Sequence, residues 1–277
     1  MDKMKKQRKT GRRSEKMFYI MCFFLMMLFM TAILAPILAP NDPYKTDILH
    51  QLNASGGSYP LGTDELGRCI LSRILYGART SLFASVSIVV VVFIIGAALG
   101  ILAGYFGGWV DGLLNRITTI FQAFPRMILA IAVAGVLGIG IRNTILALCA
   151  VYWTEYARLS RSIVISLKEK TFIQAAKVCG ESEAGIMIRH IFPNVFPDMI
   201  VTAALDIGSI IMEISALSFL GMGIKTPMAE WGAMMSAGRQ YMQTNPLLIV
   251  IPGIAIFITV IIFNLFGEKL RDRLDLQ

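Results

Sequence analysis

Six long apolar runs constrain the fold of this chain more than any other feature. A bilayer core is about 30 Å thick, and a helix needs about 20 apolar residues to cross it. The 277 residues are 56% hydrophobic and 16% charged, with a mean hydropathy of +0.66. The runs are predominantly apolar and lack the alternation of a membrane strand, which favours helices that satisfy their own backbone hydrogen bonds. We predict an all-α polytopic membrane protein with six transmembrane helices, at residues 17–38, 82–103, 117–137, 141–157, 197–219 and 247–266.

Lysine and arginine residues gather on one side of this predicted topology. A basic tail occupies residues 1–16, and further basic residues lie in residues 158–196 and 268–277. Because cytoplasmic loops are enriched in Lys and Arg, we expect both termini and residues 158–196 in the cytoplasm, with residues 39–80 outside. The first apolar run exceeds the ~7–15 residues of a signal-peptide core, so it is interpreted as an uncleaved anchor. The expected location is the cell (inner or plasma) membrane.

The positive charge and the cysteines do not indicate a nucleic-acid or metal site. The net charge is +8, but the basic residues flank apolar runs and are not interleaved with exposed aromatic residues, so no nucleic-acid partner is expected. His50 and His190 fall on opposite sides of the predicted membrane. No metal site is therefore predicted. The four cysteines lack the CxxC spacing of a metal or redox motif; they are Cys22, Cys69, Cys149 and Cys179.

A short polar segment, residues 171–193, separates the fourth and fifth apolar runs. We expect a helix over residues 164–179, ended by Gly180 in the left-handed conformation of a helix C-cap. Ser182 can cap a second short helix, and Glu183 suits its first turn because of the helix dipole. We expect such a segment between two spans to be a binding surface for a soluble partner.

The same segment offers apolar residues for a contact. Pro193 and Pro197 are expected to mark the return of the chain to the membrane. Ile186, Ile188 and Ile191 are candidate apolar anchors.

Ionisable residues inside or beside spans are candidates for function, because burying charge in lipid is costly. Asp206 and Glu213 are seven residues apart and share one helical face, toward a pathway through the bundle or a partner subunit; a bond between helices is an equally good interpretation. In the last outward loop, Glu230, Trp231 and Arg239 are candidates for docking an external protein. Trp231 is as well explained as an interfacial anchor.

Several motifs resemble one known family over nearly the whole chain beyond the basic tail. The run from Gln174 to Pro193 resembles the EAA loop of ABC-importer permeases, with Gln where that family usually has Glu. The LGTDELGR run at residues 61–68, GARTSL at 77–82 and ALSFLGMG at 216–223 resemble the C-type subunits of dipeptide, oligopeptide and nickel permeases. Cys69 and Thr119 depart from this pattern, each standing where relatives commonly have Asp.

This resemblance implies a type I ABC-importer permease (MetI-like) fold. It implies a first transmembrane helix at 17–38, an external signature loop at 39–80 and a permease core of five helices at 81–267. The segment at 158–196 becomes the cytoplasmic loop that couples to an ATPase. The residues expected to carry this coupling are Gln174, Ala175, Ala176, Gly180, Ile191 and Pro193.

The resemblance also implies partners. These are a second homologous permease subunit forming a heterodimer, two ATPase subunits and an extracytoplasmic solute-binding protein. The sequence contains no G-x-x-x-x-G-K-[ST] phosphate loop, so we expect no enzyme activity and no cofactor bound by this chain. ATP and Mg would be bound by the ATPase subunits.

The expected cargo is nickel, free or chelated, or di/oligopeptides. The alternatives are a stand-alone ion-coupled secondary transporter, for which we find no convincing internal repeat, and a membrane scaffold without a pathway.

Overall fold

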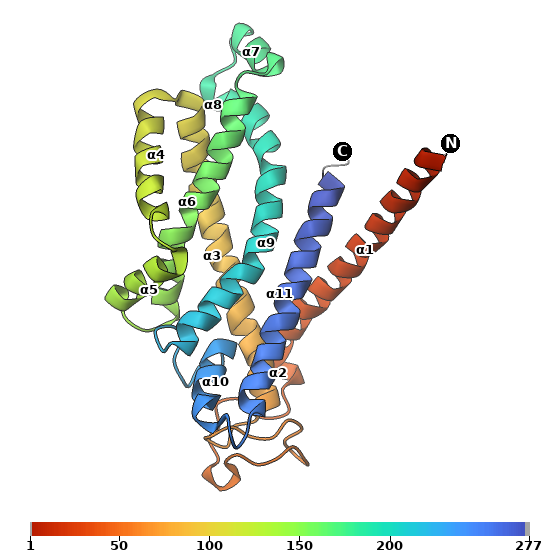
Figure 1. Ribbon diagram of the computed structural model, residues 1–277, viewed down its shortest axis with the longest axis vertical. Helices are drawn as coiled ribbons and strands as arrows, with labels where there is room; N and C mark the ends of the chain where they lie inside the picture. Colours follow the sequence, from red (N-terminus) through yellow and green to blue (C-terminus); the bar gives the residue numbers. More distant parts are fainter. Residues whose placement is uncertain (1, 275–277) are drawn as a thin grey trace. The chain divides into compact units, whose positions relative to one another are not determined.

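The computed structural model describes residues 2–274, with side chains from Lys16 onward. Met1 and residues 275–277, the end of the expected C-terminal tail, lie outside the described part. The described residues form helices joined by loops, with no β-strand, which confirms the predicted all-α class (Figure 1). The helices are α1 Asp2–Ile33, α2 Ala35–Leu38, α3 Ile70–Phe106, α4 Gly108–Gln122, α5 Arg126–Leu137, α6 Ile141–Leu167, α7 Thr171–Val178, α8 Glu183–Ile186, α9 Phe192–Phe219, α10 Trp231–Gly238 and α11 Leu247–Leu274. Short 3₁₀ turns occur at Ile48–His50 and Arg239–Tyr241, and a π-helical turn at Met187–Ile191.

Four helical stretches of the described chain are long and apolar enough to cross a bilayer. They are Lys16–Ile33, Ile70–Phe106, Glu183–Phe219 and Leu247–Leu274. A fifth is added if α4 and α5 together form one broken span. The predicted count of six is therefore not confirmed. α6 is long enough, but Arg142, Glu155, Arg158 and Arg161 interrupt its apolar run.

The third predicted span, residues 117–137, is not one continuous helix. α4 ends at Gln122, α5 begins at Arg126, and the two helix axes meet at 90°. Pro125 lies at this break; it has no backbone N–H and disfavours the helical conformation of the residue before it. The apolar run alone does not show this bend in the helix.

Contacts divide the chain into two compact units. The first contains Met1–Ser87, Ala134–Ile145 and Ala204–Gln277, and the second contains Ile88–Val133 and Leu146–Ala203. In the first unit α1 packs along α11, and α10 packs against α11.

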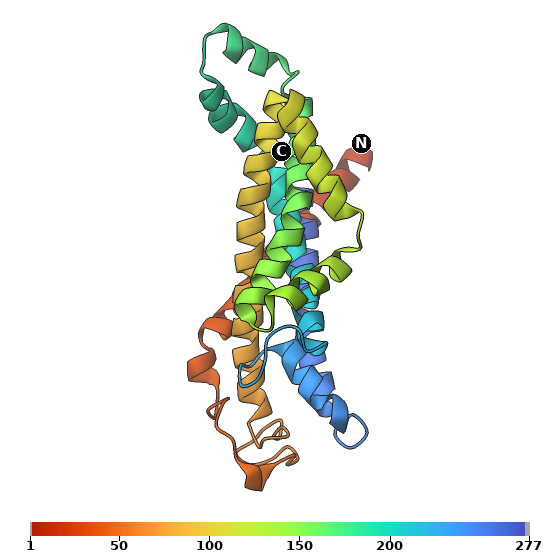
Figure 2. The ribbon, with the colours of Figure 1, turned by 90° about the vertical axis from the view of Figure 1, so that its left-hand side faces the viewer.

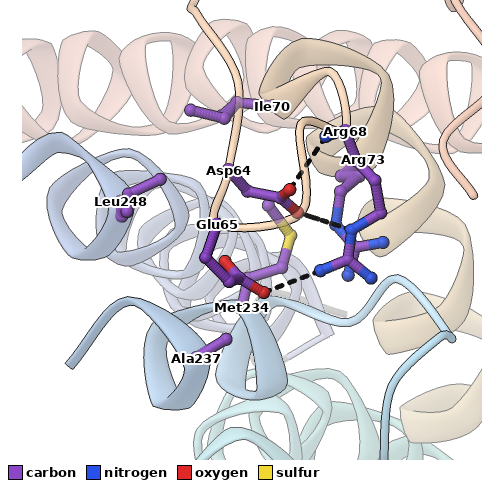
Figure 3. A pocket seen from close by; sticks show the side chains of 8 residues that line it. All are labelled: Asp64, Glu65, Arg68, Ile70, Arg73, Met234, Ala237 and Leu248. Atoms are coloured by element: carbon purple, nitrogen blue, oxygen red, sulfur yellow. Dashed lines mark hydrogen bonds and ion pairs between the residues drawn. The ribbon is translucent and has the colours of Figure 1, made fainter. Parts of the chain in front are cut away.

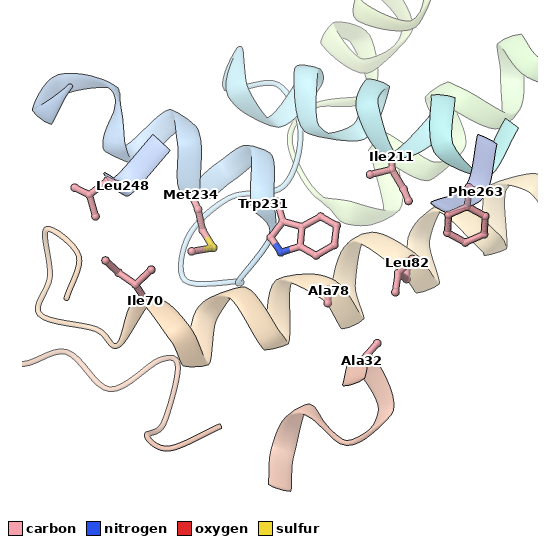
Figure 4. Packing of buried hydrophobic residues seen from close by; sticks show 9 residues of the cluster. All are labelled: Ala32, Ile70, Ala78, Leu82, Ile211, Trp231, Met234, Leu248 and Phe263. Atoms are coloured by element: carbon pink, nitrogen blue, oxygen red, sulfur yellow. The ribbon is translucent and has the colours of Figure 1, made fainter. Parts of the chain in front are cut away.

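A hydrophobic core fills the first unit (Figure 4). Trp231 is the largest of its buried side chains, and its indole nitrogen donates a hydrogen bond to the Ile74 carbonyl at 3.1 Å. Gly77 leaves room for this ring, because a Cβ there would lie 2.7 Å from the indole Cδ1. The buried members of the core are Ala32, Ile70, Ala78, Leu82, Ile211, Trp231, Met234, Leu248 and Phe263.

Beside this core lies a buried charge cluster, built by the signature residues that precede α3 and by the first turn of α3 (Figure 3). Arg68 and Arg73 are each 1% exposed. Arg68 pairs with Asp64 at 2.7 Å and with Glu65 at 2.8 Å, and Arg73 lies 3.3 Å from Asp64. Arg73 also donates to the carbonyls of Pro43 at 3.0 Å and Pro227 at 3.2 Å. One guanidinium thus joins three segments that are distant in sequence.

Close packing of α3 against α6 organises the second unit. Gly96, Gly100 and Gly104 recur every four residues and lie on one face of α3. A Cβ at Gly104 would lie 2.9 Å from the Arg161 carbonyl oxygen, and a Cβ at Gly100 would collide with the Ala157 carbonyl. Small residues at this spacing allow helix backbones to approach closely in membranes.

Replacing Asp64 with Asn is expected to lower the free energy of unfolding by about 3–5 kcal/mol, because two buried guanidinium groups lose their shared charged partner. Thermal unfolding in detergent micelles measures this effect. Asp42→Asn is the matched control: Asp42 is exposed and accepts a hydrogen bond from the Tyr44 amide, which an amide oxygen preserves, so a change within about 0.5 kcal/mol is expected. Equal small losses in both variants would contradict the role assigned to the cluster.

Replacing Gly100 with Leu is expected to lower the free energy of unfolding by about 1–3 kcal/mol or more, because the added atoms meet the α6 backbone. Gly112→Leu is the control, since no atom lies within 4 Å of a Cβ at Gly112 on α4. Unfolding curves of both variants should differ clearly, with the control unchanged or more stable. A Gly100→Leu protein as stable as the original would show that the two helices do not need this close contact.

Candidate functional site

The polar segment that follows α6 is the principal candidate site, and it begins with a break in the helix. α6 ends at Leu167, Lys170 adopts an extended conformation, and α7 starts at Thr171. The Gln174 side-chain amide donates a 3.0 Å hydrogen bond to the Lys168 carbonyl. The expected continuous helix over residues 164–179 is therefore wrong: the chain turns at residues 168–170, and Gln174 satisfies a carbonyl that the break leaves free.

Gly180 ends α7 in the predicted way. Its φ is +78°, a left-handed conformation that favours glycine. The Gly180 amide donates to the Lys177 carbonyl at 3.0 Å, and the Glu181 amide donates to the Ala176 carbonyl at 3.1 Å. These two bonds form a Schellman motif, so the turn has one defined geometry.

Ser182 starts the next helix, also as predicted. Its hydroxyl oxygen accepts a hydrogen bond from the Gly185 amide at 3.2 Å, and Glu183 occupies the first turn. The expectation of a separate short helix is nevertheless wrong. α8 continues through the π-helical turn Met187–Ile191 into α9, so Glu183–Phe219 is one helical stretch.

Pro193 and Pro197 were expected to mark the return of the chain to the membrane. Both lie inside α9, and neither ends a helix there. Pro193 is the second residue of α9 and follows directly on the π-helical turn, where the hydrogen-bond pattern already departs from that of a regular α-helix. The Asn194 side chain donates to the His190 carbonyl at 2.7 Å, so local side chains satisfy part of the altered backbone. π-helical turns inside α-helices are frequent at functional sites.

Exposure separates the candidate coupling residues into two groups. Gln174, Ala175, Gly180 and Pro193 are exposed and Ala176 is half-buried. Ile191 is buried, and among the three isoleucines proposed as anchors only Ile188 is exposed.

Three apolar side chains face outward from this region: Phe172 is 44% exposed, Val178 89% and Ile188 69%. α7 projects beyond the end of α6 in two perpendicular views of the chain (Figure 1 and Figure 2). We call Phe172, Val178 and Ile188 the apolar tip.

Sequence reasoning missed the residue that anchors this segment. Tyr105, at the end of α3, donates its hydroxyl proton to the Glu183 carboxylate. The Lys177 ammonium lies 5.0 Å from the centre of the same ring. A single side chain therefore contacts both α7 and α8. The only feature of the sequence that could have indicated Tyr105 is its position directly after Gly104, the last of the three glycines on one face of α3.

Further charged pairs brace the second unit. The Glu181 carboxylate lies 2.7 Å from His190 Nε2 and 3.6 Å from Arg189 Nη1. Asp111 on α4 pairs with Arg161 on α6, with Nη2 to Oδ2 at 2.7 Å. The Glu181 pairs lie within the candidate segment, and the Asp111–Arg161 pair joins α4 to α6, the helix that precedes the segment.

The outward candidates occupy a different environment from the one expected. Glu230 is completely buried and caps α10, accepting hydrogen bonds from the amides of Gly232 at 2.9 Å and Ala233 at 2.8 Å. Burial raises the pKa of this carboxyl, while the two amide hydrogen bonds act in the opposite direction. Trp231 belongs to the core, so the expectation that Glu230 and Trp231 present exposed side chains to a docking protein is corrected. Arg239 is exposed, with its guanidinium 5.9 Å from the centre of the Phe219 ring.

The two intramembrane carboxylates lie on α9. Asp206 and Glu213 are both partly buried in the first unit and share one helical face. Among the described residues no group of three or more His, Cys, Asp or Glu side chains is arranged to hold a metal ion.

Comparison with known proteins identifies relatives over most of the chain. Residues 96–276 match the family model described as "Binding-protein-dependent transport system inner membrane component". The dipeptide transport system permease protein DppC of Alkalihalophilus pseudofirmus is 43% identical over 244 residues, covering 88% of this chain and 80% of the relative. The nickel transport system permease protein NikC of Escherichia coli K12 is 40% identical over 236 residues, 85% of each protein. The glutathione transport system permease protein GsiD of Pectobacterium atrosepticum is 41% identical over 253 residues, covering 91% of this chain and 84% of the relative.

A solved structure has a similar fold. It is an inward-facing conformation of the MetNI methionine ABC transporter, with a TM-score of 0.56 and 18% sequence identity. The similarity covers 73% of this chain and 97% of the matched chain.

Replacing Tyr105 with Phe is expected to loosen the start of α8, because the ring remains while the bond to Glu183 is lost. A hydrogen bond to a charged group contributes about 1.5–3 kcal/mol, so its loss corresponds to roughly tenfold or more faster amide hydrogen exchange over residues 183–186. Tyr19→Phe, an exposed tyrosine on α1, serves as control and should leave this exchange unchanged. Unchanged exchange in Tyr105→Phe would remove Tyr105 from its anchoring role.

Proposed function

The chain belongs to the family of binding-protein-dependent transport system inner membrane components, and from this premise we propose that it forms part of the pathway for di/oligopeptides or for nickel, free or chelated. It is a multi-pass membrane permease subunit of an ABC importer and not an enzyme, since ATP hydrolysis in these importers belongs to separate ATPase subunits. The cargo is proposed from relatives named for dipeptide, nickel and glutathione transport.

The observation that carries the proposal is the apolar tip beside a fixed turn. Phe172, Val178 and Ile188 are exposed to solvent although each is apolar. The Schellman motif at Gly180 and the contacts of Tyr105 hold the surrounding backbone, so the surface is formed before any partner binds. Preorganised apolar anchors lose little entropy on association and are typical of a protein interface.

The proposed partner at this surface is an ATPase subunit that binds ATP and Mg. A second homologous permease subunit completes a heterodimer, and an extracytoplasmic binding protein delivers the solute. In this assembly both termini and residues 171–193 lie in the cytoplasm, consistent with the basic residues that flank them.

The coupling route follows the continuous helical stretch Glu183–Phe219. A displacement of α8 by the ATPase is carried along this stretch to Asp206 and Glu213, which we propose face the pathway or the partner permease. Nucleotide-driven closure of the ATPases then shifts the bundle between two states, each stabilised by different contacts.

Replacing Gly180 with Trp tests the coupling. Nothing in the chain lies within 4 Å of a Cβ at Gly180, so the indole would extend into the space proposed for the ATPase. We expect ATP hydrolysis stimulated by the loaded binding protein to fall at least about tenfold in the reconstituted transporter, since an obstructed hot spot costs at least 1.4 kcal/mol.

Gly57→Trp is the matched control, because Gly57 also has a positive φ (+50°) and open space around its Cβ. The reconstituted transporter with this variant should keep its ATPase attached and its stimulated ATP hydrolysis unchanged. Normal stimulated hydrolysis in the Gly180→Trp transporter would refute the proposed contact.

A further inference from the structure

A broad open cavity of about 540 Å³ lies within the first unit and contains no residue of the coupling segment. Its volume falls within the ~300–1,000 Å³ of typical small-molecule sites. One wall is a face of α3, where Tyr76, Thr80, Phe83 and Ser87 recur at helical spacing.

The remaining walls come from distant parts of the sequence. Tyr44 packs edge-on against Tyr76, with ring centres 5.9 Å apart. Ile141 and Ile145 at the start of α6, together with Met228, provide apolar surface. The cavity therefore combines phenol and hydroxyl groups with an apolar side.

Arg79 is the one charged residue among those that line this cavity. Its side chain is exposed, and within the described chain it has no ion pair or hydrogen bond. The contrast with Arg68 and Arg73 is direct: those two guanidinium groups are buried and paired with carboxylates. A guanidinium matches a carboxylate with two parallel hydrogen bonds, and a free one in a cavity is available for a ligand.

We propose that this cavity binds a carboxylate group of the transported solute, with Arg79 as the anion-binding residue; the proposal rests on the importer function given above. The chemical class is a small carboxylate-bearing molecule, either a short peptide or a carboxylate chelate of a metal. A bare divalent cation does not fit, because the charge it would meet is positive and no acidic residue lines the cavity. The tyrosines and the apolar wall accommodate the body of the solute.

The experiment uses the assembled transporter, with both permease subunits and the ATPases, in detergent without the binding protein. Equilibrium dialysis measures binding of four radiolabelled probes: alanyl-alanine, its C-terminal amide, nickel citrate and the nickel ion alone. We expect at least one carboxylate probe to bind, and the one that binds identifies the source of the carboxylate. The amide and the bare ion should bind at least tenfold more weakly.

Arg79→Gln should weaken binding of the carboxylate probe roughly tenfold, and Arg79→Lys should weaken it less, because a lysine retains the charge without the bidentate geometry. Arg142→Gln is the control, since Arg142 is also exposed in the first unit but does not line the cavity. Equal binding of acid and amide, absence of binding by both carboxylate probes, stronger binding of bare nickel, or no effect of Arg79→Gln would each overturn the proposal.

Two further measurements separate this inference from the importer function. The ATPase subunits should still co-purify with the Arg79→Gln permease, which shows that the variant assembles. If unaltered transporter lacks stimulated hydrolysis while carboxylate binding persists, the importer function fails and the cavity stands. If Arg79→Gln instead abolishes docking of the binding protein and leaves probe binding intact, Arg79 belongs to a protein interface and the proposal is wrong.

Discussion

The close approach of α3 and α6 is the contact on which the rest of the second unit depends. Without side chains at Gly96, Gly100 and Gly104, the two backbones come near enough to pack along about two helical turns. Tyr105 follows Gly104 directly, so this packing also fixes the position of the hydroxyl that contacts Glu183. A feature that stabilises the helix pair thereby sets the geometry of the coupling segment.

The sequence predicts local features of the fold well where local chemistry decides them. Apolar runs predict the helical class, and the left-handed turn at Gly180 and the cap at Ser182 are both confirmed. The 90° bend at Pro125 and the uninterrupted passage through Pro193 could not be told apart from the sequence, because both prolines disfavour a helix equally. The difference lies in the π-helical turn before Pro193, which apolar periodicity does not reveal.

The candidate sites were predictable only in part, because burial depends on residues far away in sequence. Glu230 looks like a surface charge in a loop, yet Ser81 and Ser215 lie at hydrogen-bond distance from its carboxylate and enclose it. Tyr105 carries no motif, and its role emerges from contact with Glu183, 78 residues later. Membership of the importer family was indicated by the signature motifs. Their buried arginines need the carboxylates of the same motif as partners.

The contact between the apolar tip and an ATPase is tested most directly at Cys179, a natural exposed thiol beside Gly180. Replacing Cys22 and Cys149 with Ser, while Cys69 stays buried, leaves one reactive site for a maleimide–benzophenone reagent. We predict that Cys179 reacts only from the cytoplasmic side and that illumination joins it to the ATPase subunit in the assembled transporter. Labelling from the external side, or no ATPase adduct, would contradict the account.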